Sequence, residues 1–302
     1  MNFDMKQPGK EIVIIGAGPA GLATALQLKR YGISPLILEK DQVGGLLRNA
    51  NLVENYPGFP GGISGIKLVK LFQKQIDSSE IRVSFEAVTE MAHSGTRFEI
   101  VTSENTYTPD VVIIASGTKP RTLEANLAQE EVKDKIYYEV YPLLRSKSKR
   151  ITIIGAGDAA FDYALNLAKN NEVTILNRGN QVKCLPLLWE RVLISKHITY
   201  LSEVRTRSIK LGVNNGLLLE CESCSDKLVL EADFIVTAIG REPAIDYVSI
   251  SLKNEARELE KKQKLYFVGD VHNDLYRQTA IAVGEGIITG MKIFRYLEVT
   301  SK

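Results

Sequence analysis

The stretch Ile12-Val13-Ile14-Ile15-Gly16-Ala17-Gly18-Pro19-Ala20-Gly21 joins a short apolar run to a glycine-rich turn. A helical pattern covers residues 19–31 and closes at Gly32, and a second apolar run covers residues 34–38. A strand, a glycine turn, a helix and another strand in this order predict a parallel βαβ unit. Glycines in such a turn let the chain bend tightly and let a pyrophosphate approach the helix N-terminus. The stretch therefore predicts a dinucleotide-binding unit.

An acidic residue, Glu39, ends the second predicted strand. A carboxylate at this place can accept hydrogen bonds from both hydroxyls of an unphosphorylated ribose. Glycine-rich turns also occur for packing alone, and that alternative needs no ligand. Because the strand, the helix and the acidic terminus agree, we favour the dinucleotide site. The connection that follows, residues 43–65, is too long for a simple loop and is typical of a functional segment.

The same order of elements occurs a second time around Gly155-Ala156-Gly157-Asp158-Ala159-Ala160. Each copy continues with short β-like pieces and a closing apolar strand, 110–115 in the first and 233–238 in the second. This repetition predicts an α/β protein with two Rossmann-like, three-layer ββα domains. We expect an FAD-binding domain formed by residues 1–118 and 245–302, with an NAD(P)H-binding domain, 119–244, inserted into it.

The second copy differs where its second strand ends. Asn177 stands at the place of Glu39, Arg178 follows it, and Lys183 lies a little further on. No carboxylate is present there to repel a 2′-phosphate, and the two cations could bind one. This pattern favours NADPH over NADH, while NADH remains possible. The alternative is that both cations are ordinary surface residues.

Composition excludes several classes of protein. The net charge is only +2 in 302 residues, which gives no reason to expect nucleic acid as a partner. No apolar run reaches the roughly 20 residues that a membrane span needs. Three cysteines do not make a disulfide framework, so we expect a cytoplasmic location. No combination of Cys and His residues has the spacing of a metal site.

An ordered set of motifs along nearly the whole chain resembles the low-molecular-weight thioredoxin reductases, class II pyridine nucleotide-disulfide oxidoreductases. It is similar also to the thioredoxin-reductase-like ferredoxin–NADP reductases. The motifs are the two glycine turns, Gly44-Gly45-Leu46, Glu54-Asn55-Tyr56-Pro57-Gly58, Ala115-Ser116-Gly117, Ala238-Ile239-Gly240, Gly269-Asp270-Val271 and Arg277-Gln278-Thr279.

The resemblance implies two sets of binding residues and a homodimer. For FAD they are Gly16, Gly18, Pro19, Ala20, Gly21, Glu39, Lys40, Gly45, Leu46, Asn55, Val88, Ala115, Ser116, Gly117, Gly269, Asp270, Arg277, Gln278 and Thr279. For NADP they are Gly155, Gly157, Asp158, Ala159, Ala160, Asn177, Arg178, Lys183, Ile239 and Gly240.

The chain departs from thioredoxin reductases at one decisive place. Those enzymes carry Cys-x-x-Cys just before the second glycine turn, and a gapless count places Tyr138-Glu139-Val140-Tyr141 there. A phenol cannot attack a disulfide, because that exchange needs a thiolate. A Cys-x-x-Cys does occur at Cys221-Glu222-Ser223-Cys224. We interpret this pair as structurally incidental, with a disulfide or a redox relay as the alternatives. We also interpret residues 259–264, which are strongly charged, as a solvated turn.

These observations favour an FAD-dependent NAD(P)H oxidoreductase that has no catalytic side chain of its own and passes electrons from the flavin to an external acceptor. Ferredoxin, another iron–sulfur protein or a small molecule would serve as acceptor, or as donor if electrons flow towards NADP. Two alternatives remain open. One is a disulfide reductase that uses other thiols, and the other is a flavin-binding sensor or assembly protein with little turnover.

Overall fold

The computed structural model describes residues 10–223 and 226–300, and they divide into two compact units. Unit 1 comprises the chain up to Arg48, Glu54–Lys119 and the chain from Glu242 onward. Unit 2 comprises Asn49–Val53 and Pro120–Arg241. Two short strands at the boundary, β8 (Thr118–Pro120) and β17 (Arg241–Pro243), pair with each other.

Unit 1 is built on a parallel sheet of five strands. Their order is β18 (Leu265–Phe267), β7 (Val111–Ile114), β1 (Ile12–Ile15), β2 (Leu36–Leu38) and β3 (Arg82–Ser84). In the register of the sheet, Ile14 of β1 lies opposite both Ile37 and Ile113. All four residues of β1 are buried, as expected for a central parallel strand covered on both faces.

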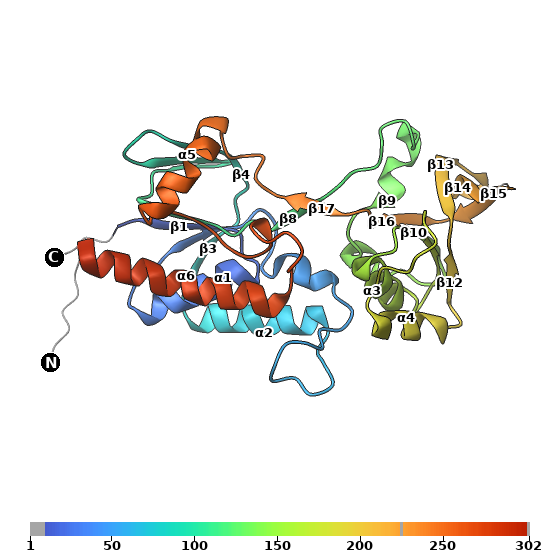
Figure 1. Cartoon of the computed structure of the whole chain (residues 1–302), viewed down its shortest axis with the longest axis horizontal. Coiled ribbons are helices and arrows are strands. Elements are labelled where there is room, and N and C mark those ends of the chain that lie inside the picture. The colour runs from blue at the N-terminus through green and yellow to red at the C-terminus, as the bar shows by residue number, and fades with distance from the viewer. Residues whose placement is uncertain (1–9, 224–225, 301–302) are drawn as a thin grey trace. The chain divides into compact units, whose positions relative to one another are not determined.

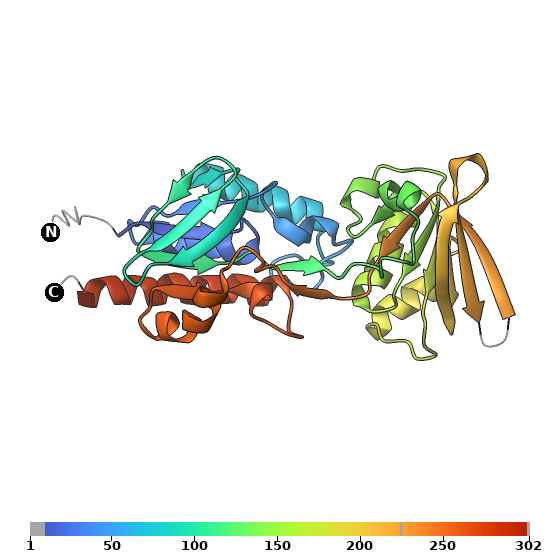
Figure 2. The same ribbon diagram turned by 90° about the horizontal axis from the view of Figure 1, so that it is seen from above.

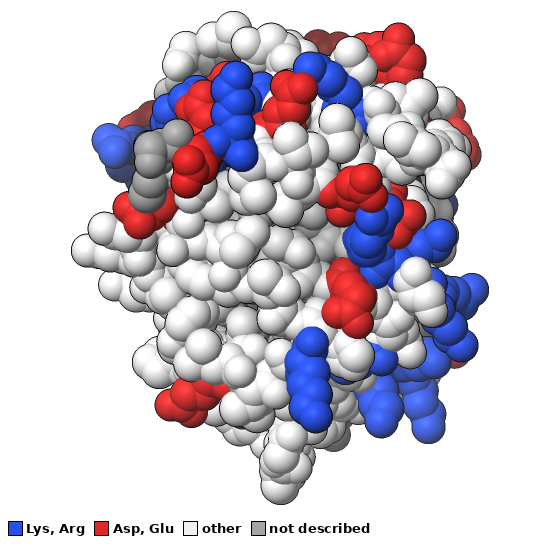
Figure 3. Space-filling model, turned by 90° about the vertical axis from the view of Figure 1, so that its right-hand side faces the viewer, with Lys and Arg blue, Asp and Glu red and all other residues white. Residues whose placement is uncertain are grey.

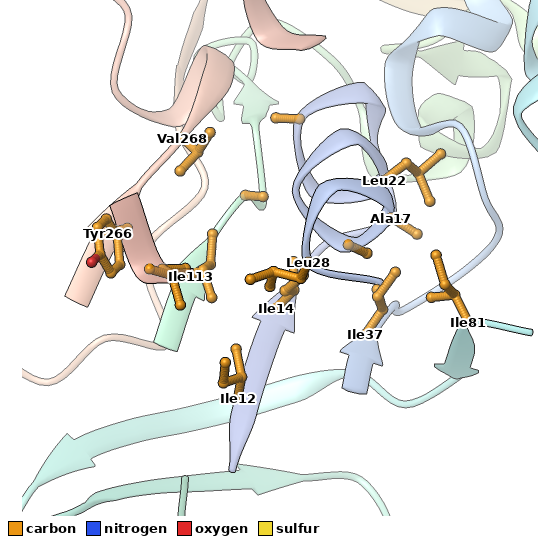
Figure 4. Packing of buried hydrophobic residues seen from close by; sticks show 14 of the residues in the cluster. Ile12, Ile14, Ala17, Leu22, Leu28, Ile37, Ile81, Ile113, Tyr266 and Val268 are labelled. Carbon is orange, nitrogen blue, oxygen red and sulfur yellow. The ribbon is translucent and has the colours of Figure 1, made fainter. Parts of the chain in front are cut away.

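Two layers cover this sheet. One face carries the helices α1 (Pro19–Arg30), α2 (Gly65–Ser78) and α6 (Thr279–Thr300), and the other carries α5 (Ile250–Lys261) with the antiparallel strands β4 (Val88–His93), β5 (Phe98–Thr102) and β6 (Thr106–Tyr107) (Figure 1). Figure 4 shows Ile14 and Ile37 of the sheet packed against Leu28 of α1. This core holds the N-terminus of α1 at the carboxyl ends of the strands.

Unit 2 repeats the plan. Its parallel sheet has the order β12 (Ile198–Leu201), β11 (Glu172–Leu176), β10 (Arg150–Ile154), β16 (Phe234–Thr237) and β9 (Ile136–Tyr137). Helices α3 (Asp158–Leu167) and α4 (Pro186–Leu193) cover one face. The antiparallel strands β13 (Val204–Leu211), β14 (Leu217–Ser223) and β15 (Asp226–Ala232) cover the other (Figure 2). The predicted pair of three-layer Rossmann-like domains is confirmed.

The prediction of a solvated turn at residues 259–264 is wrong for residues 259–261, which belong to a helix, while the turn itself occupies residues 262–264. Helix α5 runs through Lys261, and it buries Leu252 and Leu259 against the sheet of unit 1. The hydroxyl of Ser249 caps the helix by accepting a hydrogen bond from the Leu252 N–H at 3.3 Å. The buried side chains have helical spacing, but the many charges around them on the exposed side hid that pattern.

Candidate functional site

The glycines of the first turn have two different roles: two allow close packing of the backbone, and one borders open space. Gly16 has φ +108°, and a Cβ there would overlap the carbonyl oxygen of Ala115. A Cβ on Gly21 would overlap the carbonyl oxygen of Gly16, so this glycine lets α1 pack close to β1. At Gly18, by contrast, a Cβ would meet no atom within 4 Å. The turn therefore leaves open space beside the backbone at Gly18, as a bound pyrophosphate requires.

The N-terminus of α1 is arranged to receive an anion. Gly18 is the N-cap residue and provides no side-chain cap, Pro19 opens the helix, and the first turn contains no acidic residue. Backbone N–H groups and the positive end of the helix dipole therefore face this space. The long connection reaches the same place, because a Cβ on Gly45 would lie 3.4 Å from the Cα of Gly18. The adjacent Leu46 lies in the short helix Gly45–Asn49.

Glu39 is fixed beside the turn. The side chain is buried, and its two carboxylate oxygens accept hydrogen bonds from the N–H groups of Ala17 at 2.8 Å and Asp41 at 3.0 Å. Lys40 next to it is exposed. The carboxylate thus stands at the end of β2, where the sequence predicts a ribose contact.

The predicted flavin residues of unit 1 come together from distant parts of the chain. The side-chain amide of Asn55 donates to Oε1 of Gln278 at 2.9 Å, across 223 positions. A Cβ on Gly269 would lie 2.8 Å from the Cβ of Ala20, so the turn that carries Asp270 lies against the start of α1. Arg277 and Gln278 immediately precede α6, which begins at Thr279.

Two other predicted FAD residues, Ser116 and Val88, are not linked to the rest of the predicted site by hydrogen bonds that the structure describes. Ser116 follows β7 between Ala115 and Gly117, and its hydroxyl donates to the carbonyl oxygen of Ala244 at 2.8 Å. Val88 begins β4. Neither makes a hydrogen bond to another predicted FAD residue in the contacts that the structure describes.

Sequence reasoning missed a buried carboxylate close to Val88. Glu86 accepts hydrogen bonds from the hydroxyls of Ser84 at 2.5 Å, Thr102 at 2.6 Å and Tyr107 at 2.8 Å. These bonds, with those of Ser84 and Thr102 the strongest, lower its pKa to about 2. The carboxylate ties β3 to the antiparallel layer and so fixes the segment before Val88. Its three partners are spread over 24 positions, so no local motif reveals them.

The second glycine turn has the same division of roles. Gly155 has φ +125°, and a Cβ there would overlap the carbonyl oxygen of Ala238. At Gly157 a Cβ would meet no atom within 4 Å, and Gly157 is the N-cap of α3. Lys183 forms a β-bridge with Gly157, which brings this cation to the turn. Asp158 accepts the Leu185 N–H at 2.7 Å.

Four other predicted NADP residues flank this turn. Ala159 and Ala160 belong to the first turn of α3, while Ile239 and Gly240 follow β16. Gly240 has φ +114°, a conformation that favours glycine. All four therefore lie at the carboxyl end of the unit 2 sheet.

Asn177 and Arg178 have different surroundings although they are adjacent. The Asn177 amide is buried, donates to the Tyr200 hydroxyl at 2.8 Å and accepts the Gly179 N–H at 3.0 Å. It shapes the turn after β11, while Arg178 and Lys183 are exposed beside it. The turn therefore presents two cations and keeps Asn177 as an internal support.

We expect Arg178→Gln to weaken NADPH use selectively. If the guanidinium binds the 2′-phosphate, its loss should raise the KM for NADPH about tenfold, equivalent to about 1.4 kcal/mol, and leave the KM for NADH unchanged. Steady-state kinetics with both cofactors measure this. Arg205→Gln, which removes an exposed cation from β13, is the matched control. Equal effects on both cofactors would contradict a 2′-phosphate contact.

The 138–141 segment holds an ion pair. Glu139 accepts from the Arg241 guanidinium at 2.7 Å and from the side-chain amide of Asn49 at 2.6 Å. The backbone N–H of Tyr141 donates to the same Asn49 side chain at 3.0 Å. All of these residues belong to unit 2. The segment is therefore an ordered polar cluster without sulfur.

The described cysteines, Cys184 and Cys221, are both free thiols in unit 2. Burial raises the pKa of the Cys221 thiol, and burial together with the Asp158 carboxylate raises the pKa of the Cys184 thiol. Cys221 packs in the core between the sheet and the antiparallel layer. Cys224, the other member of the Cys-x-x-Cys that we interpret as structurally incidental, lies outside the described residues.

The described part of the chain contains neither a metal-binding cluster nor a candidate membrane span. Among these residues no His, Cys, Asp and Glu side chains gather in a group of three or more that could hold a metal ion. None of the described helices is both long and apolar enough for a membrane span.

Known proteins resemble this chain over most of its length. It is 29% identical to NADPH-dependent thioredoxin reductase 3 of Arabidopsis thaliana over 95% of this chain and 58% of that protein, so it spans little more than half of that relative. It is 27% identical to a Clostridium pasteurianum protein described as the 34.2 kDa protein in rubredoxin operon, over 95% of this chain and 97% of that one.

A solved structure and a family description agree with these relatives. The crystal structure of T. acidophilum thioredoxin reductase has a TM-score of 0.82 and 26% identity to this chain, and the match covers 96% of this chain and 99% of that one. Residues 10–286 match the family described as Pyridine nucleotide-disulphide oxidoreductase. The predicted family and enzyme class are confirmed. The chain belongs to the pyridine nucleotide-disulphide oxidoreductase family.

Proposed function

We propose that this chain is an NAD(P)H-dependent flavoprotein oxidoreductase that passes electrons through FAD to an external acceptor without a dithiol of its own. The observation that carries the proposal is the 138–141 segment, where Tyr138 and Tyr141 flank a Glu139 that is paired with Arg241. A thiolate is needed for disulfide exchange, and this segment supplies none. The acceptor must therefore take electrons from the flavin directly.

The residues of unit 1 fit FAD. FAD and NADPH are the cofactors of the thioredoxin reductases that the chain resembles. The open space at Gly18, the uncapped α1 N-terminus and the fixed Glu39 carboxylate would hold the ADP half. Asn55 and Gln278 would bind the flavin end. When bound, FAD accepts a hydride from a nicotinamide and returns electrons to an acceptor, while the protein provides orientation and electrostatics.

The residues of unit 2 would hold NADPH in the same way. Gly157 leaves space at the N-terminus of α3, and Arg178 and Lys183 supply the positive charge for a 2′-phosphate. Gly179 stands where thioredoxin reductases often have another Arg, so the number of cations is smaller here. The homodimer that the resemblance implies and the cytoplasmic location that the cysteine content predicts are part of the same proposal.

An acidic iron–sulfur or related electron carrier is the acceptor class to test first. One relative is described by its place in a rubredoxin operon. Figure 3 shows Lys and Arg side chains gathered towards the lower right of the face that it draws. Basic surface attracts an acidic partner and speeds its association at low salt. Ferredoxin reduction, or the reverse flow towards NADP, should therefore slow as the salt concentration rises.

Anaerobic titration with NADPH tests the electron-carrying capacity. A flavin without a dithiol should be fully bleached by about one NADPH per FAD, because the flavin accepts one hydride. A chain with a redox-active disulfide would consume about two. Consumption of two equivalents would contradict the missing dithiol, and an unchanged flavin spectrum would leave only the sensor alternative. Oxidation by ferredoxin, a quinone and a disulfide then ranks the acceptors.

Replacement of all three cysteines by alanine should leave acceptor reduction within about twofold of the unmodified enzyme. The raised pKa values of Cys184 and Cys221 disfavour the reactive thiolate at neutral pH. Stability should fall slightly, because Cys221 fills part of the core. Steady-state rates with each acceptor measure the effect, and alkylation of the native enzyme gives an independent comparison. Loss of disulfide reduction alone would support a relay through other thiols.

A further inference from the structure

The turn that carries Asp270 is pressed against the start of α1. The short helix Gly269–Val271 follows β18, and Gly269 has φ +78°. A Cβ on Gly269 would lie only 2.8 Å from that of Ala20, in the first turn of α1. Movement of this turn would therefore change the surroundings of the helix N-terminus that we assign to the FAD pyrophosphate.

A carboxylate of α6 holds both ends of this turn. Glu285 accepts the Gly269 N–H on Oε2 at 2.7 Å and the Asn273 side-chain amide on Oε1 at 2.8 Å. Both bonds have a charged acceptor, and such bonds are stronger than neutral ones. The backbone N–H groups of His272 and Asn273 close the turn onto the carbonyl oxygen of Gly269.

The same contacts continue to the start of α6. The carbonyl oxygen of Asn273 accepts a hydrogen bond from Nε of Arg277 at 2.9 Å. Glu285 therefore supports the turn of Asp270 directly, through its bonds to Gly269 and Asn273. It supports Arg277 indirectly, because Arg277 donates to Asn273. Its own place is set by helix packing, because a Cβ on the adjacent Gly286 would overlap the carbonyl oxygen of Ala20.

We propose that Glu285 is a positioning residue for the cofactor, a role that rests on the FAD site of the proposed function. Among the residues assigned to FAD, Glu285 contacts the backbone N–H of Gly269 and none of the assigned side chains in the contacts that the structure describes. It fixes the turn of Asp270 and the guanidinium of Arg277 before FAD arrives, so that less free energy is lost in ordering them on binding. A carboxylate suits this place because each of its two oxygens meets a donor.

Moving the negative charge from Glu285 to residue 273 tests the proposal. Asn273→Asp sets two carboxylates against each other and should weaken FAD binding about tenfold, as should Glu285→Ala. In the double variant N273D/E285Q, the glutamine amide can donate to the new carboxylate while its oxygen accepts the Gly269 N–H. We expect this variant to bind FAD within about threefold of the original chain. Glu298→Gln, an exposed change on the same helix, is the control.

Fluorescence titration of the apoprotein gives the FAD dissociation constants, and the visible spectrum of bound FAD and the apoprotein Tm are recorded for every variant. The proposal requires weakened binding and an altered spectrum in both single variants and recovery of both in the double variant. Unchanged binding in Glu285→Ala, or no recovery in N273D/E285Q, would overturn it. Should Glu285→Ala fail to fold, Glu285→Asp, which keeps the charge with a shorter reach, takes its place. If the original chain binds no FAD, the proposed function fails instead.

Discussion

Gly155→Ala should slow flavin reduction by NADPH about 100-fold or more while the purified protein still retains FAD. Gly155 has φ +125°, and an added Cβ would overlap the Ala238 carbonyl oxygen. The unfavourable φ alone costs roughly 1–3 kcal/mol. Relief of the overlap must move either the turn or the end of β16, and both belong to the NADPH site that we propose. We therefore expect the rate of flavin reduction to fall about 100-fold or more, as stopped-flow absorbance would measure.

Gly157→Ala is the matched control, because it adds the same methyl group two residues away. A Cβ on Gly157 would meet no protein atom within 4 Å. The apoprotein Tm should therefore stay close to that of the original chain, while the methyl group should still raise the KM for NADPH by occupying space meant for the pyrophosphate. If Gly155→Ala reduced its flavin normally, unit 2 would not be the nicotinamide-binding unit. Equal loss of FAD in both variants would also contradict the assignment of FAD to unit 1 and of NADPH to unit 2.

Local patterns were sufficient to predict the framework of the two units. The apolar run at residues 12–15 and the glycine turn after it predicted β1 and α1, because both are specified by consecutive residues. Helix α5 was missed because its two buried leucines stand among many charged residues. Helix α4 was missed too, and it has only Val192 fully buried in eight residues. Helices that bury so few side chains depend on tertiary packing that a single sequence does not display.

Site residues were predictable where a motif fixes the backbone and less so where side chains meet across the chain. The turn at Gly16 could be recognised because only glycine suits its conformation. The hydrogen bond from Asn55 to Gln278 joins two motifs that were recognised separately, but their contact depends on the complete fold. Asn177 was placed correctly at the end of β11, yet its engagement by Tyr200 follows from strand β12, which no spacing rule connects to it.

Glu86→Gln should destabilise unit 1 by about 1–3 kcal/mol at neutral pH, because one buried and two half-buried hydroxyls lose a charged acceptor. The pKa of Glu86 is about 2 in the folded chain, against an ordinary 4.5. A pKa lowered by folding means that the unfolded chain binds the proton more tightly. The contribution of Glu86 is therefore fully present above about pH 4.5 and is lost as the pH falls towards 2.

Urea unfolding at several pH values separates this effect from general acid denaturation. Between pH 6 and pH 3.5 the original chain should lose more stability than Glu86→Gln, so that the two unfolding free energies converge in acid. Glu90→Gln changes an exposed carboxylate on β4 and should follow the original chain throughout. A constant difference between Glu86→Gln and the original chain at all pH values would mean that glutamine disturbs the packing and that the ionised carboxylate is not what stabilises the fold. Because the folded chain keeps Glu86 ionised down to about pH 2, the bonds that fix the segment before Val88 should persist over this range, and Glu86 should not change FAD binding between pH 6 and pH 3.5.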